Sequence, residues 1–159
     1  MASSNDRIDT LAATVAADLA HRGSSVAVAE SLTGGLLANA LARADGASKW
    51  FRGGVVAYAA DVKHALLGVP DVAVVSRIAA EAMARQAAAL LGSPIGLAVT
   101  GVGGPEPQDG VEVGTVWVAA FADHESHAWE HRFPGDPAEI CSATCAAALS
   151  RLHEVLDAG

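Results

Sequence analysis

The hydrophobic residues of the chain fall into short segments, and their spacing changes from one segment to the next. Leu11, Val15 and Leu19 recur at the spacing of one helical face. The run 25–29, in contrast, is continuously apolar and contains β-branched residues, which is typical of a strand buried on both faces. The pattern therefore predicts helices that alternate with buried strands.

Capping and turn residues set the expected bounds of these elements. Helices are predicted at 9–22 (with Asp9 or Thr10 as the cap and Gly23 as the stop), 34–43, 61–67 and 76–91, and a closing helix is predicted with Asp136 as N-cap and Pro137 at its first position. Strands are predicted at 25–29, 50–59, 95–100, 114–121 and 127–133, the last two as an antiparallel pair joined through 122–125. Segment 101–110 is too rich in Gly and Pro to be anything but a loop. This order predicts a three-layer α/β/α sandwich with a mixed β-sheet.

The bulk composition narrows the class of protein. A length of 159 residues fits one domain, spanning 1–159. Hydrophobic residues make up 52% and aromatic residues only 4%, so the core is expected to consist of Ala, Val and Leu. The formal net charge is −8 and no run of Lys or Arg occurs, which argues against nucleic acid as a partner.

Several further patterns predict where the protein is found and what it does not bind. The first ten residues are polar and no apolar run approaches bilayer length, so we expect a cytoplasmic protein with no membrane partner. Cys141 and Cys145 lie on one face of the closing helix, as small apolar residues of a reducing compartment. His124, His127 and His131 lie on the strand pair, where alternate residues face opposite sides, so no metal site is expected.

The most informative segment is Glu30-Ser31-Leu32-Thr33-Gly34-Gly35, which joins a predicted strand to a predicted helix. It places Ser31 at the carboxyl end of the strand, where ligands bind in open α/β sheets. A hydroxyl there suits a nucleophile, and the neighbouring backbone N–H groups suit an oxyanion or a phosphate. Because Ser and Thr before a helix are commonly helix caps, the local pattern alone leaves both interpretations open.

A serine nucleophile needs a base, and no Asp/His constellation occurs at comparable loop junctions. Lys63 is the candidate, because it is one of two lysines and lies between Tyr58 and the apolar run Ala65-Leu66-Leu67. Partial burial would lower the pKa of its amine toward the working range of a general base. A lysine on a short helix is more commonly a solvated charge, so this pattern also leaves both interpretations open.

Two loops offer weaker signals. Ser48 follows the turn Asp45-Gly46, where its ordinary role is in a turn or a helix start. The glycine-rich loop 101–110 could surround a ligand phosphate with N–H groups, but it matches neither a P-loop nor the dinucleotide-binding pattern.

Six short motifs occur in a fixed order along nearly the whole chain. They are Ala29-Glu30-Ser31-x-Thr33-Gly34-Gly35, Gly46-x-Ser48-x-Trp50-Phe51-x-x-Gly54, Tyr58-x-x-x-x-Lys63-x-x-Leu66-Leu67-Gly68-Val69, Val75-Ser76-x-x-Ala79-x-x-x-Met83-Ala84, Thr100-Gly101-x-x-Gly104-Pro105 and Val113-Gly114-Thr115-Val116. One such motif is weak, whereas six in order are specific. Together they resemble the CinA C-terminal domain family, whose characterised members are nicotinamide-nucleotide amidohydrolases.

The resemblance implies an activity and a set of site residues. The implied reaction is hydrolysis of the carboxamide of nicotinamide mononucleotide (NMN) to nicotinate mononucleotide and ammonia, by a homo-oligomer without a metal or organic cofactor. Ser31 would attack the amide carbon, Lys63 would take its proton, and Tyr58 and Ser48 would orient this pair or the substrate. The resemblance also implies N–H groups of 33–35 as the oxyanion or phosphate site. The implied substrate-binding residues are Glu30, Thr33, Gly34, Gly35, Ser48, Thr100, Gly101, Gly104 and Thr115.

The chain departs from the family pattern at three places. Leu32 replaces a cysteine, and the usual Gly-Pro-Asp-Gly-Gly turn reads Gly104-Pro105-Glu106-Pro107-Gln108. The last helix lacks two arginines, at Pro137 and Cys141, and each charge-assisted bond lost to a phosphate would cost about 1.5–3 kcal/mol. Two alternatives follow: a catalytically silent relative that binds a nucleotide or a protein, and an amidase or esterase acting on another small substrate.

Overall fold

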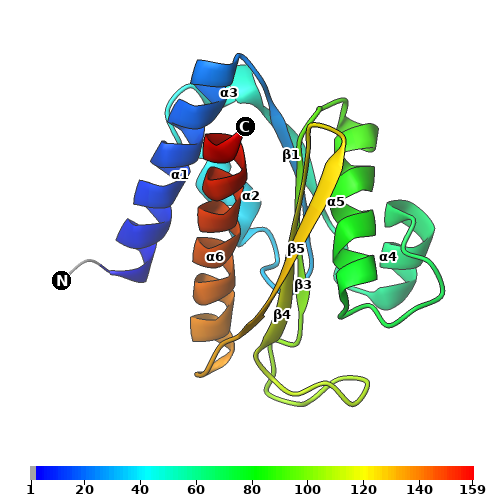
Figure 1. The fold of residues 1–159 in the computed structure, drawn as a ribbon. Helices are drawn as coiled ribbons and strands as arrows, with labels where there is room; N and C mark the ends of the chain where they lie inside the picture. The colour runs from blue at the N-terminus through cyan, green and yellow to red at the C-terminus, as the bar shows by residue number, and fades with distance from the viewer. Residues whose placement is uncertain (1–2) are drawn as a thin grey trace.

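The computed structural model describes residues 3–159, which form six helices and five strands. Their order along the chain is shown in Figure 1. The elements are α1 (Ser4–Arg22), β1 (Val26–Glu30), α2 (Leu36–Ala42), α3 (Ala47–Trp50), β2 (Phe51–Val56), α4 (Ala60–Leu67), α5 (Arg77–Leu91), β3 (Gly96–Gly101), β4 (Thr115–Ala122), β5 (Glu125–Arg132) and α6 (Pro137–Ala158).

The strands form one mixed sheet in the order β2-β1-β3-β4-β5. Strand β1 is parallel to its neighbours β2 and β3, whereas β4 is antiparallel to both β3 and β5. The carboxyl ends of β1, β2 and β3 therefore lie at one edge of the sheet, together with the start of β4. We call this edge the carboxyl edge and the opposite one the amino edge.

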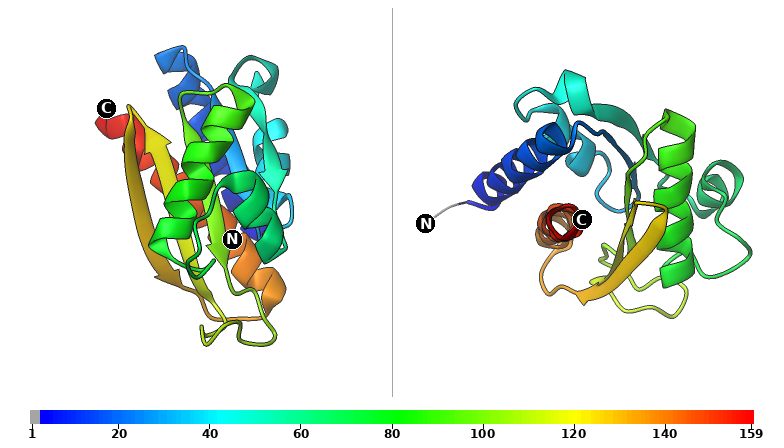
Figure 2. Two further views of the ribbon diagram at one scale, coloured as in Figure 1. Left: turned by 90° about the vertical axis from the view of Figure 1, so that its right-hand side faces the viewer. Right: turned by 45° about the horizontal axis from the view of Figure 1, so that its top comes forward.

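Helices cover both faces of the sheet, which confirms the three-layer α/β/α prediction. Helices α1, α2 and α6 lie on one face, and α5 lies on the other with α4 beside it (Figures 1 and 2). Side chains alternate along β1, so that Val26 and Val28 join the core under α1, α2 and α6, while Ala27 and Ala29 join the core under α5.

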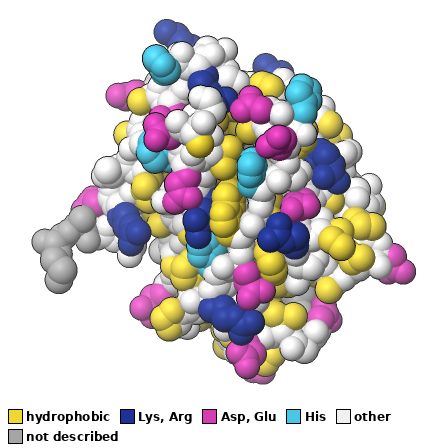
Figure 3. Space-filling view, in the orientation of Figure 1, with side chains coloured by type: hydrophobic (Ala, Val, Ile, Leu, Met, Phe, Trp, Pro, Cys, Tyr) yellow, Lys and Arg dark blue, Asp and Glu magenta, His cyan; other side chains and the backbone are white. Residues whose placement is uncertain are grey.

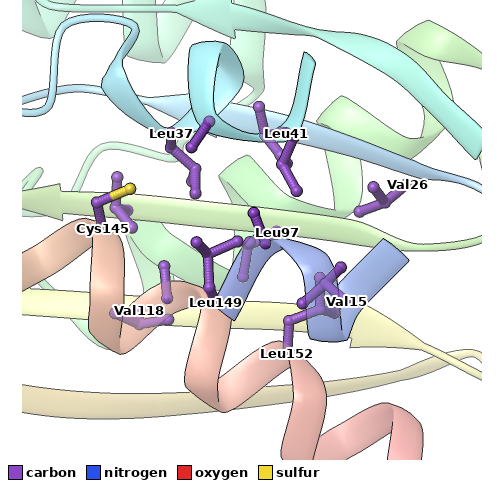
Figure 4. Close-up of a cluster of buried hydrophobic side chains, with 14 of the residues drawn as sticks. Val15, Val26, Leu37, Leu41, Leu97, Val118, Cys145, Leu149 and Leu152 are labelled. Atoms are coloured by element: carbon purple, nitrogen blue, oxygen red, sulfur yellow. The ribbon is translucent and has the colours of Figure 1, made fainter. Parts of the chain in front are cut away.

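The two cores differ in composition. Leucine and valine side chains fill the space between the sheet and helices α1, α2 and α6, as Figure 4 shows for Val15, Leu37, Leu97 and Leu149. The core under α5 is built largely from alanines, as the composition predicts. Here the backbones approach closely, because a Cβ at Gly96 would overlap the carbonyl oxygen of Ala84.

Most predicted elements are present, but the predicted start of the first helix is wrong. The helix begins at Ser4, and Ser3 is its N-cap. The Ser3 hydroxyl accepts from Asp6 N at 3.1 Å, and the Asp6 carboxylate accepts from Ser3 N at 3.1 Å. Two features hid this start from the sequence analysis. The apolar pattern begins only at Ile8, because the first turn of the helix is exposed. The capping box has Asp at its third position instead of the usual Glu or Gln.

Two other bounds differ from the prediction for local reasons. The second strand ends at Val56 instead of 59, because Ala59 already serves as the N-cap of α4. The strand pair is joined by only two residues, Asp123 and His124, both with positive φ (53° and 64°). Such a turn matches the twist of a hairpin, so β5 begins at Glu125, two residues earlier than predicted.

The closing helix and its cysteines follow the prediction. Asp136 accepts from Glu139 N at 2.8 Å as the N-cap, with Pro137 at the first position. Cys145 is buried in the core, Cys141 is half-buried, and both are free thiols.

Within 3–159, no three His, Cys, Asp or Glu side chains are grouped so as to hold a metal ion. None of the helices in that range is both long and apolar enough to cross a bilayer.

Candidate active site

The turn from β1 into α2 lies at the carboxyl edge and contains Ser31. Its backbone depends on Gly34 and Gly35, whose φ angles of 58° and 107° lie in the left-handed region that glycine adopts at little cost. Gly35 is the N-cap of α2 and provides no side chain to cap it. The capping group has to come from elsewhere.

Glu30 supplies that group from the last position of β1. Its side chain is completely buried, and its carboxylate accepts four hydrogen bonds. The donors are the Thr33 hydroxyl (2.6 Å) and the backbone N–H groups of Gly35 (3.2 Å), Leu37 (2.9 Å) and Ala38 (2.9 Å). These bonds and the positive end of α2 offset the cost of burying the charge. The family resemblance implies that Glu30 binds substrate, but in this structure its carboxylate is hydrogen-bonded to the turn and to α2.

The neighbouring N–H groups are also largely occupied. Gly34 N donates to Ser31 O at 3.1 Å, and Leu36 N donates to Thr33 O at 3.0 Å. Together with the bonds to Glu30, this satisfies the N–H groups of Gly34 and Gly35. These two groups were expected to hold an oxyanion or phosphate, but the fold already uses them.

The Ser31 side chain is buried, with 4% of its surface exposed. Its hydroxyl has no hydrogen-bond partner within 3–159, although every fully buried side-chain oxygen or nitrogen in that range has one. The hydroxyl thus keeps a small opening to solvent. Since Glu30 caps α2, the alternative that Ser31 is a helix cap does not hold.

Lys63 lies on the buried face of α4, four residues before Leu67. Only 3% of its surface is exposed, so it is not a solvated charge. Its Nζ donates to the carbonyl oxygen of Tyr58 at 3.5 Å, and it forms no salt bridge in the described part of the chain. Burial lowers the pKa of the Lys63 amine below its ordinary value.

Ser31 and Lys63 follow the carboxyl ends of two neighbouring strands, β1 and β2, and we call this part of the carboxyl edge the α4 corner. Glu30 pairs with Val56, and Ala57 N donates to Glu30 O at 2.8 Å, so continuing the register places Ala57 beside Ser31 and Tyr58 one residue further on. The Glu30 side chain points to α2, so continuing the alternation along β1 turns Ser31 toward the face covered by α4 and α5. Lys63 approaches from that same face.

The remaining expected residues of the carboxyl edge have mixed roles. The Tyr58 side chain is 71% exposed, and only its carbonyl contacts Lys63. The Thr100 hydroxyl is buried and donates to Val74 O at 2.7 Å. Thr115 is buried at the start of β4. Gly101 ends β3, and Gly104 lies in the loop that follows.

Ser48 lies at the other end of the sheet. It is exposed on α3, immediately before β2 begins. Because β2 is parallel to β1, the start of β2 is at the amino edge, so one chain does not bring Ser48 near Ser31. Its neighbours Lys49 and Trp50 line a separate surface cavity of 460 Å³.

The start of α6 lies against the candidate site. The Cys141 thiol donates to the carbonyl oxygen of Leu32 at 3.1 Å, and burial raises the pKa of this thiol. Cys141 is one of the two positions where the family pattern has arginine. Sequence reasoning missed this contact, because no local pattern indicates which turn of α6 meets residue 32.

Charges on the surface are mixed. On the face shown in Figure 3, acidic and basic side chains are interspersed. The exposed ion pairs include Arg43–Asp9 at 2.9 Å and Arg132–Glu130 at 3.3 Å. Neither the view nor these pairs indicates a basic surface for nucleic acid.

Two comparisons with known proteins place these features in context. The nicotinamide-nucleotide amidohydrolase PncC of Pseudomonas putida is 38% identical over 156 residues, which cover 94% of this chain and 98% of that protein. A CinA-like protein of Frankia casuarinae is 42% identical over 154 residues, or 93% of this chain. The chain spans only about a third (35%) of the length of that relative.

A solved structure and a family model agree with the sequence relatives. A competence-damaged protein (CinA) superfamily protein from Klebsiella pneumoniae superimposes with a TM-score of 0.91 at 30% identity, covering 96% of this chain and 99% of that one. The model of the CinA C-terminal domain matches residues 8–156. The chain therefore belongs to the CinA C-terminal domain family.

Proposed function

We propose that the chain is an amidohydrolase that cleaves the carboxamide of NMN to nicotinate mononucleotide and ammonia. The observation that carries this proposal is the corner formed by the unpartnered Ser31 hydroxyl and the buried, unpaired Lys63 amine. The nicotinamide-nucleotide amidohydrolase of Pseudomonas putida, which this chain matches over nearly its full length, supports the choice of substrate.

The mechanism follows from the protonation state of the amine. With its pKa lowered, Lys63 is more readily present as a free amine that takes the proton from Ser31 Oγ as it attacks the amide carbon. The same proton then passes to the departing nitrogen, so ammonia leaves and an acyl-enzyme remains. Water, deprotonated by Lys63, attacks the ester, the proton passes from Lys63 to Ser31 Oγ, and nicotinate mononucleotide leaves.

The surface next to this corner supports self-association. Exposed apolar side chains lie at the end of β2 (Val56), on α4 (Val62 and Leu66) and in the segment between them (Tyr58). Exposed apolar groups of this kind favour burial against another protein surface. We propose that the chain acts as one domain in a cytoplasmic homo-oligomer, on a small nucleotide and without metal, organic cofactor, nucleic acid or membrane.

The test is product analysis with purified protein. Incubation with NMN is expected to release ammonia and nicotinate mononucleotide in equal amounts. Nucleotide binding measured by calorimetry, with no product formed by the same sample, would instead support a catalytically silent binding domain.

A second candidate is amide hydrolysis on a substrate without phosphate. Pro137 and Cys141 favour it, because they stand where the family pattern has cations and Cys141 is instead bonded to Leu32. Parallel assays with NMN and nicotinamide riboside separate the two candidates. Equal kcat/KM for both would show that the phosphate is not recognised.

A further inference from the structure

The eight backbone N–H groups from Ser31 to Ala38 divide into two sets. The five from Gly34 to Ala38 all donate to acceptors within the turn, three of them to the Glu30 carboxylate. The three from Ser31 to Thr33 have no acceptor within 3–159. The free donors therefore adjoin the Ser31 hydroxyl, and the occupied ones lie beyond it.

The orientation of the free donors is fixed by the carbonyl groups that share their peptide planes. In a trans peptide the N–H points opposite to the C=O. The Leu32 N–H belongs to the peptide whose carbonyl, Ser31 O, accepts from Gly34 N at 3.1 Å. The Thr33 N–H belongs to the peptide whose carbonyl, Leu32 O, accepts from Cys141 at 3.1 Å. Both peptide planes are thus held by the fold before any ligand arrives.

The third free donor points in another direction. The N–H of Ser31 shares a peptide with Glu30 O, which accepts from Ala57 N on the β2 side. This N–H therefore points toward β3, within the plane of the sheet. The other two free donors, the N–H groups of Leu32 and Thr33, follow the nucleophile along the chain, and the Thr33 N–H points away from Cys141 and α6.

We infer that the N–H groups of Leu32 and Thr33 bind the oxyanion that develops when Ser31 attacks, and that Glu30 is the positioning residue that holds this turn. The assignment rests on the proposed function. Donors fixed in advance stabilise developing negative charge without reorganisation in the transition state. A donor on the residue after the nucleophile is a known arrangement in serine hydrolases.

The hydrogen-bond partners of the Glu30 carboxylate suit it to this positioning role. Its carboxylate joins the Thr33 hydroxyl to three N–H groups of α2, so position 33 is tied to the start of the helix. An oxyanion at Gly35 would have to displace this completely buried carboxylate. The Gly35 N–H is therefore already occupied, and we do not assign it as an oxyanion donor.

The first experiment changes the carboxylate and its hydroxyl partner. Glu30→Gln places an NH₂ group against N–H donors and is expected to lower kcat for NMN by about tenfold or more, with KM changed less than about threefold. Thr33→Val is expected to lower kcat similarly, and Thr33→Ser, which keeps the hydroxyl, to restore it. Asp6→Asn, a matched change at the N-terminus of α1, should leave kcat unchanged.

The second experiment removes one donor directly. An amide-to-ester replacement at position 33 substitutes oxygen for the N–H and is expected to lower kcat by about 100-fold. The same replacement at Leu36 removes a turn hydrogen bond but no free donor, so it controls for loosening of the turn. Unchanged kcat in the position 33 ester, or equal losses in both esters, overturns the oxyanion assignment.

A fluorophosphonate probe separates this inference from the choice of substrate. Ser31 Oγ forms a bond to phosphorus, fluoride leaves, and the proton passes to Lys63, so the labelling rate reports the nucleophile and its donors without NMN. If NMN is not cleaved but labelling occurs and falls about tenfold in folded Glu30→Gln, the substrate is wrong and the inference stands. Labelling of Glu30→Gln at the wild-type rate, or no labelling of Ser31 at all, refutes the inference.

Discussion

Two neighbouring regions of the carboxyl edge each bury one charged side chain, but the two side chains differ in how many hydrogen bonds they form. In the β1–α2 turn, the Glu30 carboxylate is completely buried and accepts four hydrogen bonds. In α4, the Lys63 amine is 3% exposed and makes one long hydrogen bond, to Tyr58 O at 3.5 Å. No carboxylate pairs with this amine in the described chain.

The difference indicates what each charge does. A buried carboxylate that accepts four hydrogen bonds fixes the backbone around it. A buried amine with one weak acceptor destabilises the fold while charged, and burial lowers its pKa. A group retained at a cost to stability is expected to have a function that does not depend on stability. The contrast supports the proposal that Glu30 maintains the fold and that Lys63 takes part in the chemistry.

The largest expected effect comes from the hydroxyl that lies between the two regions. Ser31→Ala removes the nucleophile and is expected to lower kcat for NMN by about 10³-fold or more. The hydroxyl has no protein partner to lose, so the melting temperature should stay within about 2 °C of wild type. Steady-state kinetics and calorimetry of one preparation measure both quantities, and undiminished turnover would remove Ser31 from the mechanism.

Lys63→Met tests the assignment of chemistry to the amine by separating activity from stability. Loss of the general base is expected to lower kcat by about 10²- to 10³-fold. The free energy of unfolding should rise by about 1 kcal/mol, because an apolar side chain of similar length replaces an amine with one weak acceptor. Chemical denaturation checks this, and a clear loss of stability would show that Lys63 holds the fold instead.

Lys63→Arg is the matched control for the same position. Arginine keeps the positive charge but stays protonated, so it cannot take a proton from Ser31. Activity is expected to fall as far as in Lys63→Met. Retention of activity in the arginine variant would mean that position 63 contributes charge and not a base.

The pH dependence sharpens the contrast further. A lowered pKa for Lys63 predicts that kcat/KM falls about tenfold for each pH unit below that pKa, as the amine becomes protonated. Between the folded pKa and the ordinary value of 10.5, the unfolded chain binds more protons than the folded one, so this group makes stability rise with pH. The stability advantage of Lys63→Met should therefore shrink as pH rises through this window, which denaturation at several pH values measures.

The sequence predicted the layers and the carboxyl-edge location of Ser31 because both depend on local periodicity. Apolar runs such as 25–29 can only be buried between helices, and the strand ending at Glu30 fixes where Ser31 lies. The role of Glu30 was missed, because the N–H groups that donate to its carboxylate lie up to eight residues later in the chain, and a carboxylate at the end of a strand carries no periodic signal.

Positions that depend on strand order were harder to predict. Ser48 lies shortly before a strand and Ser31 directly after one. The sequence pattern predicts a loop hydroxyl at both positions. Only the parallel pairing of β1 and β2 shows that one lies at the amino edge and the other at the carboxyl edge. Family context grouped the two residues, whereas the geometry of one chain separates them.

Tyr58→Phe tests whether the α4 corner uses a side chain or only a backbone carbonyl. Lys63 contacts Tyr58 O, and the phenol ring is 71% exposed, so removal of the hydroxyl is expected to change kcat by less than about threefold. Tyr58→Ala should mainly raise KM, because it removes apolar surface beside the substrate. A kcat loss of about tenfold or more in Tyr58→Phe would instead place the phenol in the proton-transfer step.

Ser48→Ala carries the smallest expected effect and tests whether the carboxyl edge is complete within one chain. Since Ser48 is exposed at the amino edge, its loss should leave kcat and KM within about twofold of wild type. A loss of about tenfold or more has only one geometric explanation, which is that a second copy presents its amino edge to this site. Dilution then decides, because activity that needs two copies falls per mole of chain as the oligomer dissociates, whereas activity contained in the Ser31–Lys63 corner does not.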